Sequence, residues 1–273
     1  MYNLTTILIV GFFTFIINIT ETLAYSMRYA GLKTKQIAIA MSFVSSTLLV
    51  SRLSNMFQAP LLGKMVDTTV QIGTKQSLHN LELSFRIILF SGFLGIFVAA
   101  LMTPTFVKIF QVAISKFLQI GSLPRMFLLT ISSPRRLRII LKCITLPRLS
   151  MLKNISIKNL PKKFLILNGF VASIYAIGVL AALLAGAYLP ELRATAIQLS
   201  GIVNGVATIL FTLVVDPTGA RITDQAVHNK RPAEDVKSVV FFLMFSRIIG
   251  ILIISQIIFI PAVKYIMAIT KLI

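Results

Sequence analysis

A chain of 273 residues with 56% hydrophobic and 13% charged residues does not have the composition of a soluble globular protein, in which about 25% of the residues are charged. Its 27 Lys and Arg against 8 Asp and Glu give a formal net charge of +19. The single cysteine excludes an intramolecular disulfide and a cysteine-based zinc cluster. These features indicate an integral membrane protein.

Six apolar windows follow one another along the chain. Most reach the roughly 20 residues that a membrane-spanning helix needs, and the third does so only when it is extended to Ser84 and Pro104. The windows are Leu4–Ala24, Ile37–Met65, Ile87–Leu101, Phe164–Leu189, Ala194–Val215 and Val239–Ile260. They predict an all-α polytopic membrane protein with about six transmembrane helices and no soluble domain. The first window has no basic segment before it, so we expect a retained span and not a cleaved signal peptide.

The loops between these windows differ in charge. With six spans, nineteen Lys and Arg fall on one side and five on the other, and three lie within spans. The positive-inside rule therefore predicts that both termini lie outside and that the large central loop is cytoplasmic. The predicted organisation is a first three-helix membrane half (1–107), a basic cytoplasmic, partly interfacial connecting segment (108–163) and a second three-helix half (164–273).

The connecting segment lies in a stretch without acidic residues. Between Glu82 and Glu191 there are thirteen Lys and Arg but no Asp or Glu. Prolines divide the segment into short pieces, such as Pro134–Lys142, in which Leu and Ile alternate with cations. Such pieces suit short helices that lie in the membrane interface with their basic faces on anionic lipid headgroups. A loop that only sets the topology is an equally good interpretation, whereas nucleic-acid binding is disfavoured because no stacking aromatic residues separate the charges.

Matching marks in the two halves suggest an internal repeat. Residues Pro60–Asp67 and Pro217–Asp224 both place a cation at the fifth position and Asp at the eighth, and Arg-Ile-Ile occurs at 86–88 and 247–249. Three spans in each half would give the halves opposite topology, as in inverted-repeat transporters, with broken helices expected at Pro60 and Pro217. Chance similarity between apolar helices is the alternative.

Polar and charged residues occur inside or at the ends of the predicted spans. Arginine stays charged and offers a planar fork to phosphate oxygens, so such residues suit a phosphorylated client. By position along the chain, we expect Arg28 and Arg221 near the cytoplasmic face, Arg247 at mid-membrane, and Arg52 and Arg86 nearer the outside. The candidate translocation residues are Glu21, Arg28, Arg52, Asn55, Gln58, Arg86, Asp216, Arg221 and Arg247.

The same residues have a structural interpretation. Internal ion pairs would neutralise them, with Glu21 beside Arg52 or Arg247, and Glu82 four residues before Arg86.

Enzymatic motifs are weak in this chain. His79 and His228 fall in loops on opposite sides, and there is neither an HExxH motif nor a P-loop. Residues Asp216–Arg221 resemble the opening of the CDP-alcohol phosphotransferase motif, but the further spaced aspartates that hold metal are missing. We therefore expect no enzyme, no catalytic residue, no metal site and no cofactor.

Four stretches carry a family resemblance: Asn18–Gly31, Ser51–Gly63, Asp216–Ala226 and Ser246–Gly250. They resemble the Amj family, bacterial lipid II flippases that act as alternates to MurJ. The resemblance implies a multi-pass protein of the bacterial cytoplasmic membrane. It also implies translocation of the undecaprenyl-pyrophosphate-linked precursor for peptidoglycan biosynthesis, cell wall biogenesis and cell shape. Apart from Arg86, the candidate residues lie on these stretches.

The resulting hypothesis is a flippase in which arginines at successive depths accept the pyrophosphate while two inverted halves rock. The expected partners are lipid II and, at the basic loop, anionic membrane lipids, with no nucleic acid. Two alternatives stay open: a membrane enzyme that acts on polyprenyl phosphate lipids, and a non-transporting envelope scaffold. The sequence indicates neither an oligomeric state nor an energy source.

Overall fold

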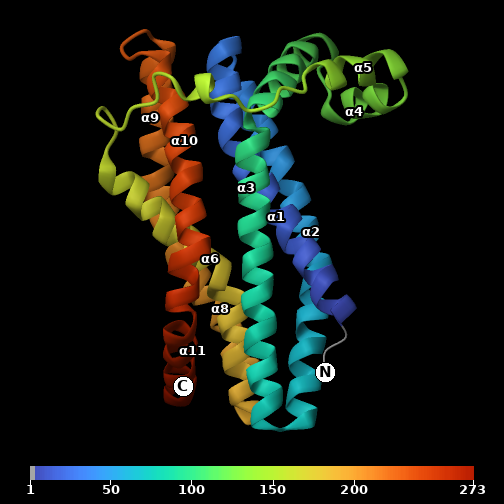
Figure 1. Ribbon diagram of the computed structural model, residues 1–273, viewed down its shortest axis with the longest axis vertical. Coiled ribbons are helices and arrows are strands. Elements are labelled where there is room, and N and C mark those ends of the chain that lie inside the picture. Colours follow the sequence, from blue (N-terminus) through green and yellow to red (C-terminus); the bar gives the residue numbers. More distant parts are fainter. Residues whose placement is uncertain (1–3) are drawn as a thin grey trace.

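The computed structural model describes residues 4–273 as an elongated helical bundle (Figure 1). Within these residues, six helical segments are long and apolar enough to cross a bilayer, which confirms the predicted all-α polytopic fold. They are α1 (Leu4–Thr34), α2 (Ile37–Ile72), α3 (Lys75–Ile120), α6 (Lys162–Tyr188) and two composite segments, Pro190–Val227 and Ala233–Leu272.

The fifth and sixth spans are each built from several pieces. The fifth contains the 3₁₀ turn η2 (Pro190–Leu192), α7 (Arg193–Gln198), α8 (Ser200–Leu210), the π turn η3 (Phe211–Val215) and α9 (Asp216–Val227). The sixth contains α10 (Ala233–Ile249), the π turn η4 (Gly250–Ile254) and α11 (Ser255–Leu272). Single π turns inside α-helices are frequent at functional sites. Here η3 ends directly before Asp216, and η4 begins shortly after Arg247.

The two prolines that we expected to break helices behave differently. Pro217 lies in the first turn of α9, directly after the π turn η3. Pro60 lies inside the uninterrupted helix α2, so the expectation of a break there is wrong. The intact hydrogen bonds on either side of a proline, together with neighbouring helices, can maintain a transmembrane helix through the missing N–H.

The connections between the helices lie at the two ends of the bundle. The α4–α5 hairpin and the α9–α10 turn lie at one end, and the α2–α3 turn and the C-terminus lie at the other (Figure 1). We call these the hairpin end and the turn end. At the turn end, Gly73 adopts φ +66° and closes α2, while the Thr74 side chain caps α3 by accepting a hydrogen bond from the Ser77 N–H. The sequence predicts that the hairpin end is cytoplasmic.

The longest helix, α3, runs well past the predicted third span. Its 46 residues extend about 69 Å at 1.5 Å per residue, against about 30 Å of hydrocarbon in a bilayer. The stretch from residue 96 to 120 contains no glycine, and the helix ends only where Gly121 adopts φ +70°. The predicted boundary between residues 107 and 108 therefore lies inside α3. Beyond it come α4 (Leu123–Ile131), α5 (Pro134–Lys142) and the 3₁₀ turn η1 (Leu149–Leu152).

Buried apolar side chains form three clusters. The shared cluster at the turn end draws on both halves and includes Val66, Phe85, Leu184 and Phe259. At the hairpin end, the second-half cluster includes Phe164, Ile222 and Leu243, together with Tyr25 from α1. The first-half cluster includes Met27, Phe43, Phe110 and Ile114.

Glycines allow close helix crossings in both halves, as in many membrane bundles. A side chain at Gly95 on α3 would collide with the Phe15 carbonyl of α1, and one at Gly250 would collide with the backbone of Gly169 on α6. The first and third spans thus cross at glycine, as do the fourth and sixth. The three-plus-three inverted repeat itself stays a prediction.

Candidate functional site

A polar network at the middle of α1 joins the two halves of the protein. The Glu21 carboxylate accepts a hydrogen bond from Ser51 Oγ of α2 at 2.8 Å and pairs with Arg247 Nη2 of α10 at 2.5 Å. The same Arg247 nitrogen lies 3.3 Å from Asn18 Oδ1. Arg247 Nε is buried and has no hydrogen-bond partner within the described residues. This guanidinium therefore retains an unused donor while its charge is balanced by Glu21.

A second set of polar groups continues this network into α6. Tyr25 donates a hydrogen bond to Asn168 Oδ1 at 3.1 Å, and the Asn168 amide donates to Ser246 Oγ and to the Leu243 carbonyl. Asn168 is only 1% exposed, and sequence reasoning missed it. Its signal was available, because it is a lone amide inside an apolar window, where polar groups are costly and usually functional.

Nearer the hairpin end, Arg28 of α1 forms an ion pair with Asp216 of α9. The Arg28 side chain is 9% exposed, whereas that of Asp216 is 43% exposed. Gly219 lies one turn after Asp216, and a β-carbon there would press on the Arg28 guanidinium. The absence of a side chain at Gly219 thus makes room for this ion pair between the halves.

Other candidates fix helices to one another. Gln58 Nε2 donates to Thr14 Oγ1 at 2.7 Å and thereby joins α2 to α1. Arg86 pairs with Glu82 at 3.0 Å, as its spacing indicated, and also donates to the side chain and carbonyl of Gln256 on α11. Arg86 therefore links the halves at the turn end.

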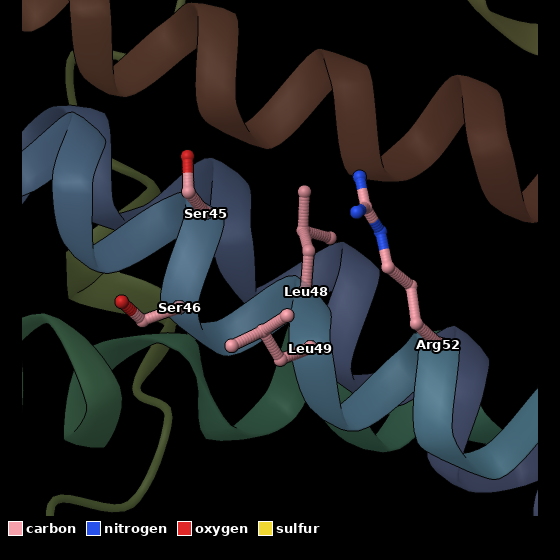
Figure 2. Close-up of a pocket in the computed structure, with 5 residues that line it drawn as sticks. All are labelled: Ser45, Ser46, Leu48, Leu49 and Arg52. Carbon is pink, nitrogen blue, oxygen red and sulfur yellow. The ribbon is translucent and has the colours of Figure 1, made fainter. Parts of the chain in front are cut away.

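Three candidates, Arg52, Asn55 and Arg221, are exposed, and their side chains form no hydrogen bond or ion pair with other residues of the described chain. Arg52 lines a cavity of about 270 Å³ together with Ser45, Ser46, Leu48 and Leu49 of α2. Figure 2 shows its guanidinium extending away from the α2 backbone. A guanidinium with free donors can bind a phosphate group through two parallel hydrogen bonds.

Arg52 lies close to the level of Arg247 along the bundle. Its neighbour Ser51, near the middle of α2, is hydrogen-bonded to the same carboxylate that pairs with Arg247. The predicted depth of Arg52 relative to the outer membrane face stays a prediction. The embedded arginines thus form a central pair, Arg52 and Arg247, with Arg28 toward one end and Arg86 toward the other.

The charge state of this site follows from these contacts. Arg28, Arg86 and Arg247 are each balanced by a carboxylate, so an anionic ligand could bind them only by competing with that carboxylate. Arg52 requires no such exchange.

Comparisons with known proteins give one consistent result. The family model Amj, described as alternate to MurJ, matches residues 13–270. A curated protein of Bacillus subtilis (strain 168), "Lipid II flippase Amj", is 33% identical over 272 residues, which cover 99% of each chain. No solved structure matches.

Proposed function

Because this chain belongs to the Amj family, we propose that it is a lipid II flippase of the bacterial cytoplasmic membrane. Its whole length aligns with a curated relative of that name, and its helices include six that can cross a membrane within the described residues. The function serves peptidoglycan biosynthesis, since lipid II is the precursor of that polymer.

The observation that carries the proposed mechanism is the position of Arg52. It is a guanidinium on the candidate span α2 without a carboxylate partner among the described residues, and it lines an open cavity on α2, directly after Ser51, which binds Glu21 of the central pair. Arg52 provides the first contact for the substrate pyrophosphate. The lipid tail stays in the bilayer, where α2 exposes Leu49 and Leu53 next to this arginine.

Transfer then proceeds by exchange of anions. The pyrophosphate competes with Glu21 for Arg247, whose unused Nε donor can contribute a further hydrogen bond. Arg28 and Asp216 form the corresponding pair toward the hairpin end, where Arg221 is exposed to the incoming headgroup. Rocking of the two halves moves the phosphate past these pairs. Asn55, which is exposed on α2 within one turn of Arg52, contacts the sugar, while Gln58 holds α2 against α1 through its hydrogen bond to Thr14.

The basic connecting segment attracts anionic lipid. None of its twelve Lys and Arg residues forms an ion pair within the described part of the chain. Each uncompensated cation near an anionic membrane surface contributes about 1 kcal/mol to binding. This attraction gathers anionic lipids, lipid II among them, at the hairpin end.

The test is the accessibility of lipid II to an externally added lipid II-cleaving toxin in cells depleted of other flippases. Arg52→Ala should lower the cleaved fraction at least tenfold, because the phosphate loses its first partner. Arg52→Lys should be intermediate, since it keeps the charge but not the fork. Lys64→Ala, an exposed cation on the same helix, is the matched control and should transport normally. Normal transport by Arg52→Ala at normal expression would contradict the proposal.

Transport leaves the substrate chemically unchanged, so lipid II extracted from cells that have not been treated with the toxin should be intact by mass spectrometry. A modified lipid product that depends on a divalent metal and on Asp216 would indicate an enzyme instead. Loss of function on deletion of residues 135–158, with normal function of Arg52→Ala, would indicate a scaffold.

A further inference from the structure

The hairpin of α4 and α5 does not pack flush against the extension of α3. Between them lies a groove with a volume of about 390 Å³, within the range of about 300–1,000 Å³ that small-molecule sites occupy. One wall is the face of α3 from Ile109 to Ile120, and the other wall comes from α4 and α5 up to Cys143. The groove is separate from the Arg52 cavity.

The lining of this groove combines an apolar floor with two cations. Val112, Ala113, Met126 and Ile140 are among its apolar members, and Lys116 and Arg136 are its charged members. No acidic residue lines it. Lys116 Nζ donates to Gln119 Oε1 at 3.0 Å, and the Arg136 guanidinium forms no hydrogen bond or ion pair with other described residues. The groove thus offers an apolar slot beside two uncompensated positive charges.

The surroundings of the groove place it at a lipid surface. Phe127 and Leu128 of α4 are 66% and 64% exposed, and Leu141 of α5 is 61% exposed. Short helices that expose large apolar side chains beside Arg and Lys lie in the membrane interface. Under the predicted topology, this is the interface of the cytoplasmic leaflet, which contains anionic phospholipids.

We propose that the groove is a binding site for one anionic phospholipid, with a hydrocarbon chain along the apolar floor and the phosphate between Lys116 and Arg136. This inference deepens the proposed affinity of the basic segment for anionic lipid and rests on it. The two cations favour an anionic occupant over a purely apolar one, and the slot distinguishes the site from a diffuse basic surface. A bound lipid fills the space between the hairpin and α3 and holds the hairpin against the helix.

The chain contains no tryptophan, so a single introduced one reports on its surroundings. Phe127 lines the groove, and the Phe127→Trp variant is reconstituted in vesicles with brominated-chain phosphatidylglycerol or brominated-chain phosphatidylcholine. We expect phosphatidylglycerol to quench the fluorescence with an apparent affinity about fivefold higher than that of phosphatidylcholine. The Phe12→Trp variant, on an exposed apolar position of α1, should show no such preference.

Further variants distinguish binding in the groove from a general attraction of anionic lipid to the basic segment. In the Phe127→Trp background, Arg136→Gln should abolish the preference, whereas Arg138→Gln should retain it, because Arg138 lies on the same short helix but does not line the groove. Ala113→Phe fills the slot from the α3 wall without changing charge and should also abolish the preference.

Equal quenching by the two lipids, or equal loss of preference in Arg136→Gln and Arg138→Gln, would contradict the proposal that the groove binds an anionic phospholipid. Displacement of the brominated lipid by lipid II far below the concentration of unlabelled phosphatidylglycerol would overturn the phospholipid assignment and make the groove a substrate site. The assay measures no transport, so its failure leaves the flippase test at Arg52 unaffected.

Discussion

At the turn end of the bundle, apolar side chains from both halves form one cluster, whereas at the hairpin end each half packs its own. The shared cluster contains Val66 and Phe85 from the first half and Leu184 and Phe259 from the second. The first-half and second-half clusters at the hairpin end are separate, although α1 contributes Tyr25 to the latter and Tyr29, Leu32 and Ala100 of the first half pack against it. There, the Arg28–Asp216 ion pair is a principal link between the halves.

This difference indicates which end can open first. Separating an apolar cluster leaves unfilled space and lost contacts, which a lipid or a water molecule compensates poorly. Separating an ion pair leaves two charged groups that water or a phosphate can satisfy. The halves thus share an apolar cluster at the turn end, whereas at the hairpin end they meet through the Arg28–Asp216 ion pair and a few apolar contacts of α1, and we propose that the hairpin end opens first.

The largest expected effect comes from locking the turn end. Asp67 of α2 and Arg193 of α7 form an ion pair at 2.7 Å across the halves. In a Cys143→Ala background, we replace both with cysteine and join them with a short, reducible thiol-specific cross-linker. Transport in the toxin assay should cease because the shared cluster can no longer open, and reductant should restore it. The Asp67→Cys variant alone is the control, and undiminished transport after complete cross-linking would refute an opening at this end.

The next effect concerns stability. Phe85 is fully buried in the shared cluster, and Phe110 is 8% exposed in the first-half cluster. Phe85→Ala should lower the free energy of unfolding in detergent by up to about 3–5 kcal/mol, because the cavity is bounded by both halves. Phe110→Ala should cost less, since the hairpin end can relax around it. A larger loss for Phe110→Ala would reverse the proposed difference between the ends.

A smaller effect is expected at Asp216. Asp216→Asn retains an acceptor oxygen for Arg28 but removes the opposite charge from a guanidinium that is largely buried. We expect a stability loss of about 1.5–3 kcal/mol, the range for hydrogen bonds to charged groups. Transport should fall as well, because Arg28 would then hold the substrate phosphate too strongly. Unchanged unfolding and unchanged transport together would remove this pair from the mechanism.

The smallest effect on stability and transport is expected from removing the ion pair at the turn end. The side chains of Asp67 and Arg193 are 57% and 38% exposed, so the surroundings screen their attraction. Asp67→Asn should change the free energy of unfolding by about 0–1 kcal/mol and leave transport intact. A loss as large as that of Asp216→Asn would mean that polar contacts also hold the turn end.

Local patterns were sufficient to predict much of the fold. Each span is a continuous apolar stretch, and the Glu82–Arg86 pair follows from helical spacing alone. The sequence predicts an end of the third span at Pro104, whereas α3 continues through this proline to Ile120, where Gly121 in a left-handed conformation ends it. The π turns η3 and η4 have no recognised sequence signature.

The partners of the site residues could be predicted only in part. From the sequence, either Arg52 or Arg247 could be the partner of Glu21. The structure pairs Glu21 with Arg247, 226 residues later, because α1 crosses α10 at this point. The level of Arg52 along the bundle depended in the same way on a tertiary contact, the hydrogen bond of Ser51 to Glu21. The roles assigned to these residues in translocation stay proposals.

The helix α3 also has a mechanical consequence. It is one unbroken rod of about 69 Å whose first turns pack in the shared cluster and whose last turns carry the α4–α5 hairpin (Figure 1). Because α3 also packs against α1 at Gly95 and in the first-half cluster through Phe110 and Ile114, it would move together with the first half, and a small rotation of that half would become a larger displacement at the hairpin. If the hairpin is anchored among lipids, that displacement works against the membrane surface. The lipid composition of the cytoplasmic leaflet would then slow or speed the opening of the turn end, on the opposite side of the membrane, without any contact with the substrate.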